Sequence, residues 1–166
     1  MTTRRGFLRG LDVIRACNRL GIVVDVAHGT FELVKRAAAV TTRPLVLSHT
    51  ALTATPSPRG RQIGSEHARV VAEIGGIVGV WPNRYAFRDR AAYGVGIGRM
   101  VEAIGADHVG IGTDMEGLNG ETVFDDYSEL PAIVAALRAT GLDAADVAKI
   151  LGGNYRRVFA AVTADA

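Results

Sequence analysis

Two histidines and one aspartate stand where predicted β-strands end: His28, His49 and Asp114. Each closes a short, almost continuously apolar run, which is typical of a strand buried on both faces of a parallel sheet. The carboxyl ends of parallel strands share one face of a fold, and neighbouring strands lie about 4.8 Å apart. The two imidazoles can therefore converge on one ion, and with carboxylates they suit zinc or a related divalent metal. A lone histidine at a strand end is more often a hydrogen-bonded structural residue, but the shared register of the three favours a metal site.

Other polar residues have weaker patterns. Arg59 and Arg61 lie in a loop beyond His49, where a guanidinium could bind a substrate carboxylate through two hydrogen bonds or could simply be solvated. Trp81 ends the next predicted strand and either walls the same pocket or belongs to the core. His67, inside a predicted helix, and His108, at the opposite end of a strand, are expected to be structural.

Strands and helices alternate along the whole chain. Apolar runs predict four strands, at residues 22–28, 44–49, 76–81 and 108–114. Hydrophobic periodicity and N-cap residues predict a first helix ending before Gly21 and further helices at 30–39, 65–75, 91–104, 128–139, 143–151 and 154–162. This order predicts a single α/β domain over residues 1–166, with about four parallel strands, flanking helices and right-handed crossovers.

Two folds fit this alternation: a small doubly wound sheet, or half of an eight-stranded TIM-type (β/α)8 barrel. Gly110 and Gly112 lie within a predicted strand, and no third glycine opens a helix behind them. The phosphate-binding fingerprint of dinucleotide-binding folds is therefore absent, which favours the half-barrel. Asp25, within the first predicted strand, is either an outer partner of a metal-bound imidazole or a hydrogen-bonded buried carboxylate.

Composition excludes several classes of protein. The 166 residues are 48% hydrophobic and 22% charged, which excludes a disordered chain. The net charge is +2, and the basic residues are scattered without interleaved aromatics, so we expect no nucleic-acid partner. No run approaches the roughly 18 apolar residues of a membrane span, so we expect no membrane partner either.

The single cysteine, Cys17, excludes an intramolecular disulfide and fits a cytoplasmic location. Residues 3–9 resemble the start of a twin-arginine export signal. The ten residues that follow carry three charges, and an amphipathic helix with Leu8, Leu11, Ile14 and Cys17 on one side explains the segment better.

Six motifs follow one another over nearly the whole chain: NRLGIVVDVAH (18–28), PLVLSH (44–49), RQI (61–63), GGIVGV (75–80), DHVGIGTDMEG (107–117) and KILGGNYRRVF (149–159). Together they resemble the renal or membrane dipeptidase family, zinc-dependent dipeptidases of the amidohydrolase type (peptidase family M19). The resemblance implies a (β/α)8 barrel whose C-terminal half this chain matches, and hydrolysis of the peptide bond of a dipeptide substrate.

The resemblance also implies a role for each candidate residue. His28 and His49 would be ligands of one zinc ion of a two-metal centre. Asp114 would be the catalytic aspartate that handles the proton and the tetrahedral intermediate. Arg61, with Arg59 as a second candidate, would bind the terminal carboxylate of the dipeptide.

The family's His-x-Asp motif and bridging glutamate have no counterpart in this sequence. Because paired metals polarise the scissile carbonyl and deprotonate a bridging water, we expect the chain to be incomplete or inactive alone. A half-barrel leaves two open edges and an apolar inner face, so we expect a homo-oligomer or pairing with the missing N-terminal half. The alternatives are a non-enzymatic half-barrel, a subunit of an assembled barrel, or another amidohydrolase-type hydrolase.

Overall fold

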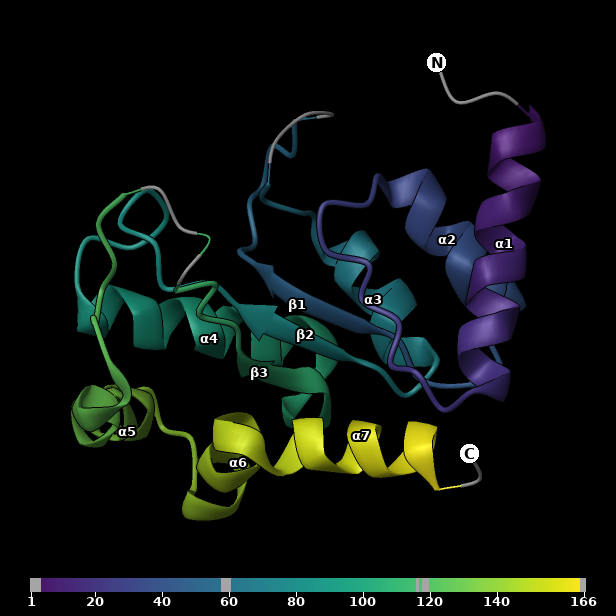
Figure 1. The fold of residues 1–166 in the computed structure, drawn as a ribbon. Helices are drawn as coiled ribbons and strands as arrows, with labels where there is room; N and C mark the ends of the chain where they lie inside the picture. Colours follow the sequence, from purple (N-terminus) through teal and green to yellow (C-terminus); the bar gives the residue numbers. More distant parts are fainter. Residues whose placement is uncertain (1–3, 58–60, 116, 118–119, 165–166) are drawn as a thin grey trace.

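The computed structural model describes residues 4–57, 61–115, 117 and 120–164. Its central sheet has three parallel strands in the order β1-β2-β3, namely Val46–Thr50, Ile77–Val80 and Val109–Ile111. The helices around it are α1 (Arg4–Arg19), α2 (Phe31–Val40), α3 (Ser65–Glu73), α4 (Arg90–Ile104), α5 (Leu130–Ala139), α6 (Ala144–Ala148) and α7 (Asn154–Thr163). In Figure 1, α2 and α3 lie on one side of the sheet and α7 passes along the other.

The prediction of a full strand at residues 22–28 was wrong. This segment pairs with β1 through one isolated bridge, between Asp25 and Val46. The Val26 carbonyl then accepts an amide three residues later at 3.0 Å, which turns the chain away from the sheet. The Ser48 amide, which a continuing ladder would use, donates instead to the Asp25 carboxylate at 3.1 Å. The sheet of the described residues therefore has three strands and a bridged edge segment.

The two faces of the sheet are covered by different helices, because successive side chains of a strand point to opposite faces. The side chains packed into the main core, toward α2 to α5, are Leu47, Val78, Val80 and Val109. A smaller cluster on the other face joins the sheet to α7 and consists of Val46, Ile77, Val158 and Val162. Beyond this small cluster, toward the carboxyl ends of the strands, the same face borders an open cavity.

The pairing of β1 with β2 is irregular at the point where the first histidine of the sheet lies. Leu47 pairs with Val78 but Thr50 pairs with Val80, so Ser48 and His49 together stand opposite one residue of β2. Such a bulge bends the strand and redirects a side chain. That opposing residue is Gly79, and a methyl group placed on it would overlap the Ser48 carbonyl oxygen.

Most of the predicted helices are present. Thr30 caps α2 as predicted, and its hydroxyl oxygen accepts the Leu33 amide at 3.2 Å. The glycine-rich α4 also forms, and a side chain on Gly94 would crowd the Ala136 carbonyl of α5 at 2.8 Å. The helix predicted from residue 128 begins with a single 3-10 turn, and α5 proper begins at Leu130. No helix in the described ranges is both long and apolar enough to cross a bilayer.

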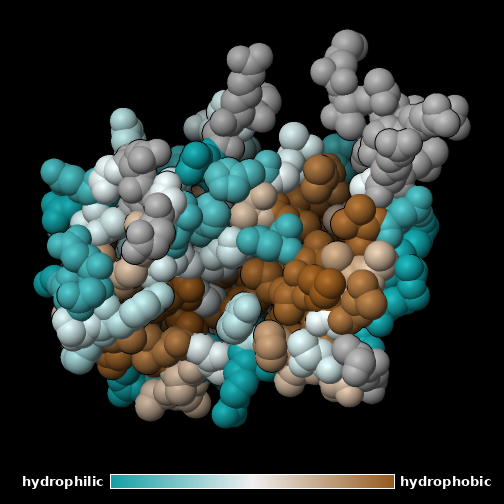
Figure 2. Space-filling view, in the orientation of Figure 1, coloured by the Kyte–Doolittle hydropathy of each residue, from teal (hydrophilic) through white to brown (hydrophobic). Residues whose placement is uncertain are grey.

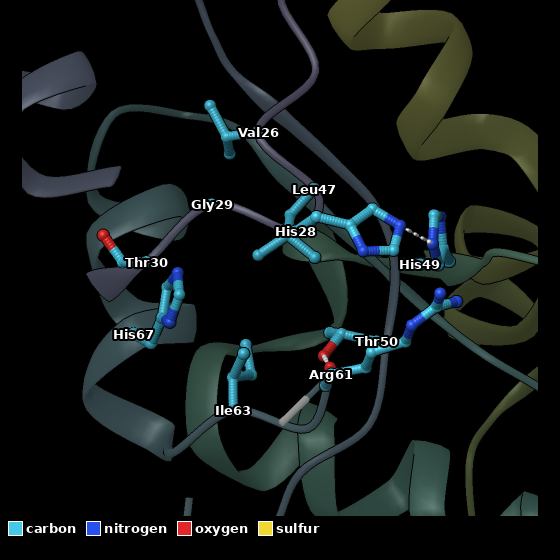
Figure 3. A pocket seen from close by; sticks show the side chains of 10 residues that line it. All are labelled: Val26, His28, Gly29, Thr30, Leu47, His49, Thr50, Arg61, Ile63 and His67. Atoms are coloured by element: carbon cyan, nitrogen blue, oxygen red, sulfur yellow. Dashed lines mark hydrogen bonds between the residues drawn. The ribbon is translucent and has the colours of Figure 1, made fainter. Parts of the chain in front are cut away.

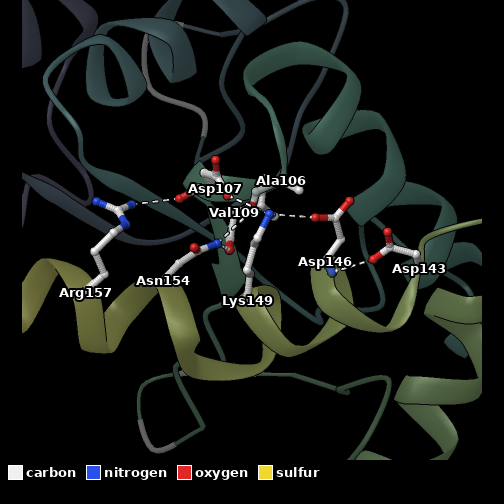
Figure 4. A network of polar contacts seen from close by, with 8 residues as sticks. All are labelled: Ala106, Asp107, Val109, Asp143, Asp146, Lys149, Asn154 and Arg157. Atoms are coloured by element: carbon white, nitrogen blue, oxygen red, sulfur yellow. Dashed lines mark hydrogen bonds and ion pairs between the residues drawn. The ribbon is translucent and has the colours of Figure 1, made fainter.

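A polar network joins the C-terminal helices to the amino end of β3 (Figure 4). The buried Asn154 side chain donates to the carbonyls of Ala106 and Val109 at 2.7 and 2.8 Å. The Arg157 guanidinium donates to two further backbone carbonyls, and the Lys149 ammonium lies between two carboxylates. These bonds satisfy backbone oxygens at the end of the sheet opposite to the candidate site.

Candidate metal and active site

The three residues predicted at strand ends lie together in the folded chain. The Nε2 atoms of His28 and His49 are 3.0 Å apart, and Asp114 Oδ2 lies 3.6 Å from His49 Nε2. The two imidazole rings meet edge to face, with centroids 4.9 Å apart (Figure 3). The three residues come from three separate segments: His28 from the turn after residue 26, His49 from the bulge of β1, and Asp114 from the loop after β3. The predicted convergence is thus present in the structure.

Two of these residues have unusual backbone conformations. The φ angle is 62° at His28 and 49° at Asp114, in the left-handed region that non-glycine residues rarely adopt. Histidine and aspartate tolerate this region better than most residues, yet the conformation still costs about 1–2 kcal/mol. Both positions lie where the chain leaves the sheet, so the tight reversal brings each side chain back over the strand ends.

His49 lies deepest of the three. Its side chain is 12% exposed, against 21% for Asp114. Burial lowers the pKa of His49, the Asp114 carboxylate opposes that shift, and His28 adds to it. At neutral pH the imidazole therefore stays uncharged, which is the form that binds metals. The hydroxyl of Ser48 lies 2.9 Å from His49 Nδ1 and holds the orientation of the ring.

The donor chemistry fits a metal ion, although the number of donors is small. Tetrahedral zinc with Zn–N bonds of about 2.0–2.1 Å separates two nitrogen ligands by roughly 3.3 Å, so the two rings need to open only slightly. Within the described residues, however, no group of three or more His, Cys, Asp or Glu side chains could hold an ion. The two imidazoles thus supply part of a coordination sphere, which other ligands would have to complete.

Arg61 lies beside this cluster. Its guanidinium carbon is 5.6 Å from the centroid of the Trp81 ring, which is itself 5.6 Å from the His49 ring. Its backbone carbonyl accepts a 2.8 Å hydrogen bond from the Thr50 hydroxyl, which fixes the loop to β1. Arg61 and Trp81 both line an open cavity of about 650 Å³, whose lining contains neither histidine. Trp81 itself is buried, and its ring meets the His49 ring edge to face. Arg59 lies outside the described residues.

The remaining polar residues have clear positions. The Asp25 carboxylate accepts the backbone amides of Ala27 and Ser48, so the predicted hydrogen bonding is present, but the residue is exposed and the predicted burial was wrong. His108 Nδ1 lies 2.9 Å from a backbone carbonyl at the far end of the sheet, as expected of a structural residue. His67 is also buried, but it lines a pocket together with both site histidines. Sequence reasoning missed this role, although a histidine on the buried face of an amphipathic helix was a signal.

The family model described as "Membrane dipeptidase (Peptidase family M19)" matches residues 7–166. The chain belongs to peptidase family M19. Among curated relatives of this M19 chain, the dipeptidase ataJ of Aspergillus terreus is 33% identical over 147 residues, which cover 83% of this chain and 35% of the relative.

Two solved structures share the fold. The probable dipeptidase PvdM from Pseudomonas aeruginosa superposes with a TM-score of 0.84 at 21% identity, over 95% of this chain and 54% of that one. A metallo peptidase from Rhodobacter sphaeroides, liganded with a phosphinate mimic of the dipeptide L-Ala-D-Ala, gives 0.81 at 25% identity, over 96% and 47%. The M19 chain thus spans about half the length of these solved relatives. The predicted family and the α/β class of the fold are confirmed.

Proposed function

We propose that this M19 chain carries half of a zinc-dependent dipeptidase site, which hydrolyses the peptide bond of dipeptides. The convergence of two imidazole Nε2 atoms and one carboxylate at the carboxyl ends of parallel strands carries the proposal. Membership of the M19 family supports the reaction class. The related metallo peptidase that binds a phosphinate dipeptide mimic supports the substrate class.

Each residue has a role that its position allows. His28 and His49 would hold the ion through Nε2, with the Ser48 hydroxyl orienting the His49 ring. Bound zinc polarises a carbonyl and lowers the pKa of a bound water to about 7. Asp114, a carboxylate beside His49, takes the proton from the attacking water and delivers it to the leaving amine nitrogen.

Arg61 is the proposed clamp for the substrate carboxylate. Its guanidinium lies over Trp81 at the wall of the 650 Å³ cavity, and Arg61 also lines the smaller pocket that His49 borders. A guanidinium can bind a carboxylate with two parallel hydrogen bonds, which fixes the carboxylate in space. Because a dipeptide has its terminal carboxylate one residue from its only peptide bond, a clamp at this position selects dipeptides. Arg59 remains the second candidate for this role.

We also propose that another stretch of polypeptide covers the open face of the sheet, as the remaining half of the barrel. A cavity of about 590 Å³ lies on this face and is lined by Ser48, Gly79 and Gly112 among others. Hydrophobic residues gather on the same side of the molecule in Figure 2. Exposed large apolar side chains on α1, on α7 and at residues 20–22 between α1 and the edge bridge include Val13, Leu20, Ile22, Tyr155 and Phe159. The covering stretch would also supply the ligands that the described residues lack.

Zinc binding tests the site without requiring turnover. Calorimetry on the purified chain should show zinc binding that is lost in His49→Ala and His28→Ala, because one imidazole among solvent ligands holds zinc poorly. His108→Ala, at the far end of the sheet, is the matched control and should bind zinc as the unmodified chain does. Equal affinity in the unmodified chain and in a variant lacking both site histidines would exclude the metal site.

Hydrolysis tests the reaction and the partner together. The chain together with its covering segment should cleave dipeptides in a zinc-dependent reaction. A lactone and a simple amide, which other amidohydrolases cleave, serve as comparison substrates in the same assay. Light scattering after size-exclusion chromatography reports the state of the chain alone. A monodisperse, cooperatively melting monomer would contradict the need for a covering segment, and a dimer would identify a second copy as the cover.

A further inference from the structure

A small pocket lies behind the histidine pair, on the helix side of the sheet. Its volume is about 150 Å³, and its walls come from the turn at His28, from β1, and from the amino end of α3, where His67 lies. Figure 3 shows the rings of His28 and His67 on opposite walls, with Thr30 and Thr50 also at the edge of the pocket. The pocket therefore connects the candidate site to a histidine that the proposed function does not use.

Two ring nitrogens at this pocket lack partners. His67 is only 8% exposed, and its Nε2 atom is buried with no hydrogen-bond partner among the described residues. His28 Nε2 faces His49, whereas His28 Nδ1 has no partner within the part of the chain that the structure describes. In Figure 3 the Nδ1 edge of the His28 ring faces the pocket. His28 is exposed, so its Nδ1 can reach water directly, whereas a buried polar atom without a protein partner, such as His67 Nε2, is normally satisfied by ordered water.

We infer that ordered water fills this pocket and links His28 Nδ1 to His67 Nε2, so that His67 is a positioning residue for the His28 imidazole. A water needs only about 10–15 Å³ of such space, so the pocket holds more than one. The Thr50 hydroxyl donates to the Arg61 carbonyl and can still accept a hydrogen bond. The Thr30 hydroxyl accepts the Leu33 amide and can still donate. The waters thus have the additional polar partners that they need.

The donor and acceptor directions agree along the whole chain of contacts. The distances leave the donor of each contact open; we assign the Ser48 hydroxyl as the donor to His49 Nδ1, and His49 Nε2–H then donates to His28 Nε2. This assignment leaves the proton of His28 on Nδ1, from which it donates to water, and the water donates to His67 Nε2. Burial lowers the pKa of His67, which keeps the imidazole uncharged, and in the Nδ1–H tautomer Nε2 has a lone pair that can accept.

The same proton position prepares His28 for a metal. A histidine that binds through Nε2 must carry its proton on Nδ1, and that N–H almost always donates to an outer partner. For His49 the partner is the adjacent Ser48 hydroxyl, which can accept as well as donate. For His28 the partner is the water held by His67. This consequence rests on the proposed function, whereas the water link itself does not.

Nitrogen-15 NMR of the metal-free chain tests the link directly. His28 should be mainly the Nδ1–H tautomer, and His67→Leu should shift it toward the Nε2–H form. His67→Gln, whose amide oxygen can accept in place of Nε2, should restore the original tautomer. Zinc affinity by calorimetry should fall roughly 10- to 100-fold in His67→Leu, as for other outer partners of metal ligands, and recover in His67→Gln.

His108→Leu is the matched control, since it removes another structural histidine at the opposite end of the sheet. It should lower thermal stability without changing the His28 tautomer or zinc affinity. Folded His67→Leu protein with an unchanged His28 tautomer would overturn the inference. If His67→Leu does not fold, the unmodified chain decides: nuclear Overhauser contacts between long-lived water and the His28 and His67 rings support the link, and their absence overturns it. A shifted tautomer with unchanged zinc affinity would leave the water link intact and count against the metal role of His28.

Discussion

Gly112 supports the candidate site without contributing a side chain, and its replacement by alanine is the sharpest test of the site's backbone geometry. A methyl group there would overlap the Ser48 carbonyl oxygen and lie 3.0 Å from the Cα of His49. Both neighbours are backbone atoms of the β1 bulge, so no side-chain rotation can relieve the overlap. Either the bulge or the end of β3 has to move, and each movement displaces a candidate site residue.

The size of the effect follows from this contact. Overpacking a tight site costs about 1–3 kcal/mol. A loss of about 2 kcal/mol lowers the Tm of a domain of this size by about 4–8 °C. We therefore expect Gly112→Ala to melt several degrees lower. We also expect it to bind zinc more weakly, because the Nε2 atoms of His28 and His49 would no longer face each other.

Gly98→Ala is the matched control for the thermal measurement. Gly98 lies within α4, and a methyl group there would make an ordinary 3.8 Å contact with Thr140. Alanine is favoured over glycine in a helix interior by about 1 kcal/mol, so this variant should melt at the same temperature or higher. If Gly112→Ala matched Gly98→Ala in both Tm and zinc affinity, the close approach of β1 and β3 would not support the site.

Three further predictions concern other parts of the chain. Asn154→Ala should lower the free energy of unfolding in urea by about 2–4 kcal/mol, because it leaves the Ala106 and Val109 carbonyls without their donor; an unchanged midpoint would contradict this. Burial lowers the pKa of His67, so below about pH 6.5 the unfolded chain binds more protons at this residue than the folded chain does. The Tm should therefore fall as the pH is lowered from about 6.5 toward about 5. That slope should be shallower in His67→Leu, and an identical slope would show that His67 does not cause it. In the active assembly, Arg61→Ala should raise KM for a dipeptide roughly 10- to 100-fold, which is the range expected for a lost charged hydrogen bond. The KM for the same dipeptide with an amidated C-terminus should change far less, because that substrate has no carboxylate to bind. Equal changes in the two KM values would exclude Arg61 as the carboxylate clamp.

The convergence of His28, His49 and Asp114 could be predicted because it depends on topology. The edge segment before His28, β1 and β3 all run parallel, so the sequence order alone puts His28, His49 and Asp114 at the same edge of the sheet. Helix starts such as Thr30 were also predictable, since a short hydroxyl side chain satisfies free amides through local contacts alone. These features are encoded within a few residues of the sequence or by the order of the elements.

Features that depend on contacts between distant segments could not be predicted. The apolar run at residues 22–28 is typical of a strand, but the Asp25 carboxylate takes the Ser48 amide and ends the ladder after one bridge. The bulge at His49 likewise depends on Gly79, a residue of a different strand. His67 was assigned to structure because a pocket formed by three elements has no signature in a single helix.

Local strain is concentrated at the residues proposed for chemistry. Within the described ranges, His28 and Asp114 are the non-glycine residues with a left-handed backbone, at about 1–2 kcal/mol each. That sum is a substantial part of the roughly 5–15 kcal/mol by which domains are stable. Glycine would relieve the strain at either position, but it would remove the imidazole or the carboxylate. A left-handed backbone favours glycine, so a histidine or an aspartate retained there indicates that its side chain is needed for chemistry rather than for stability.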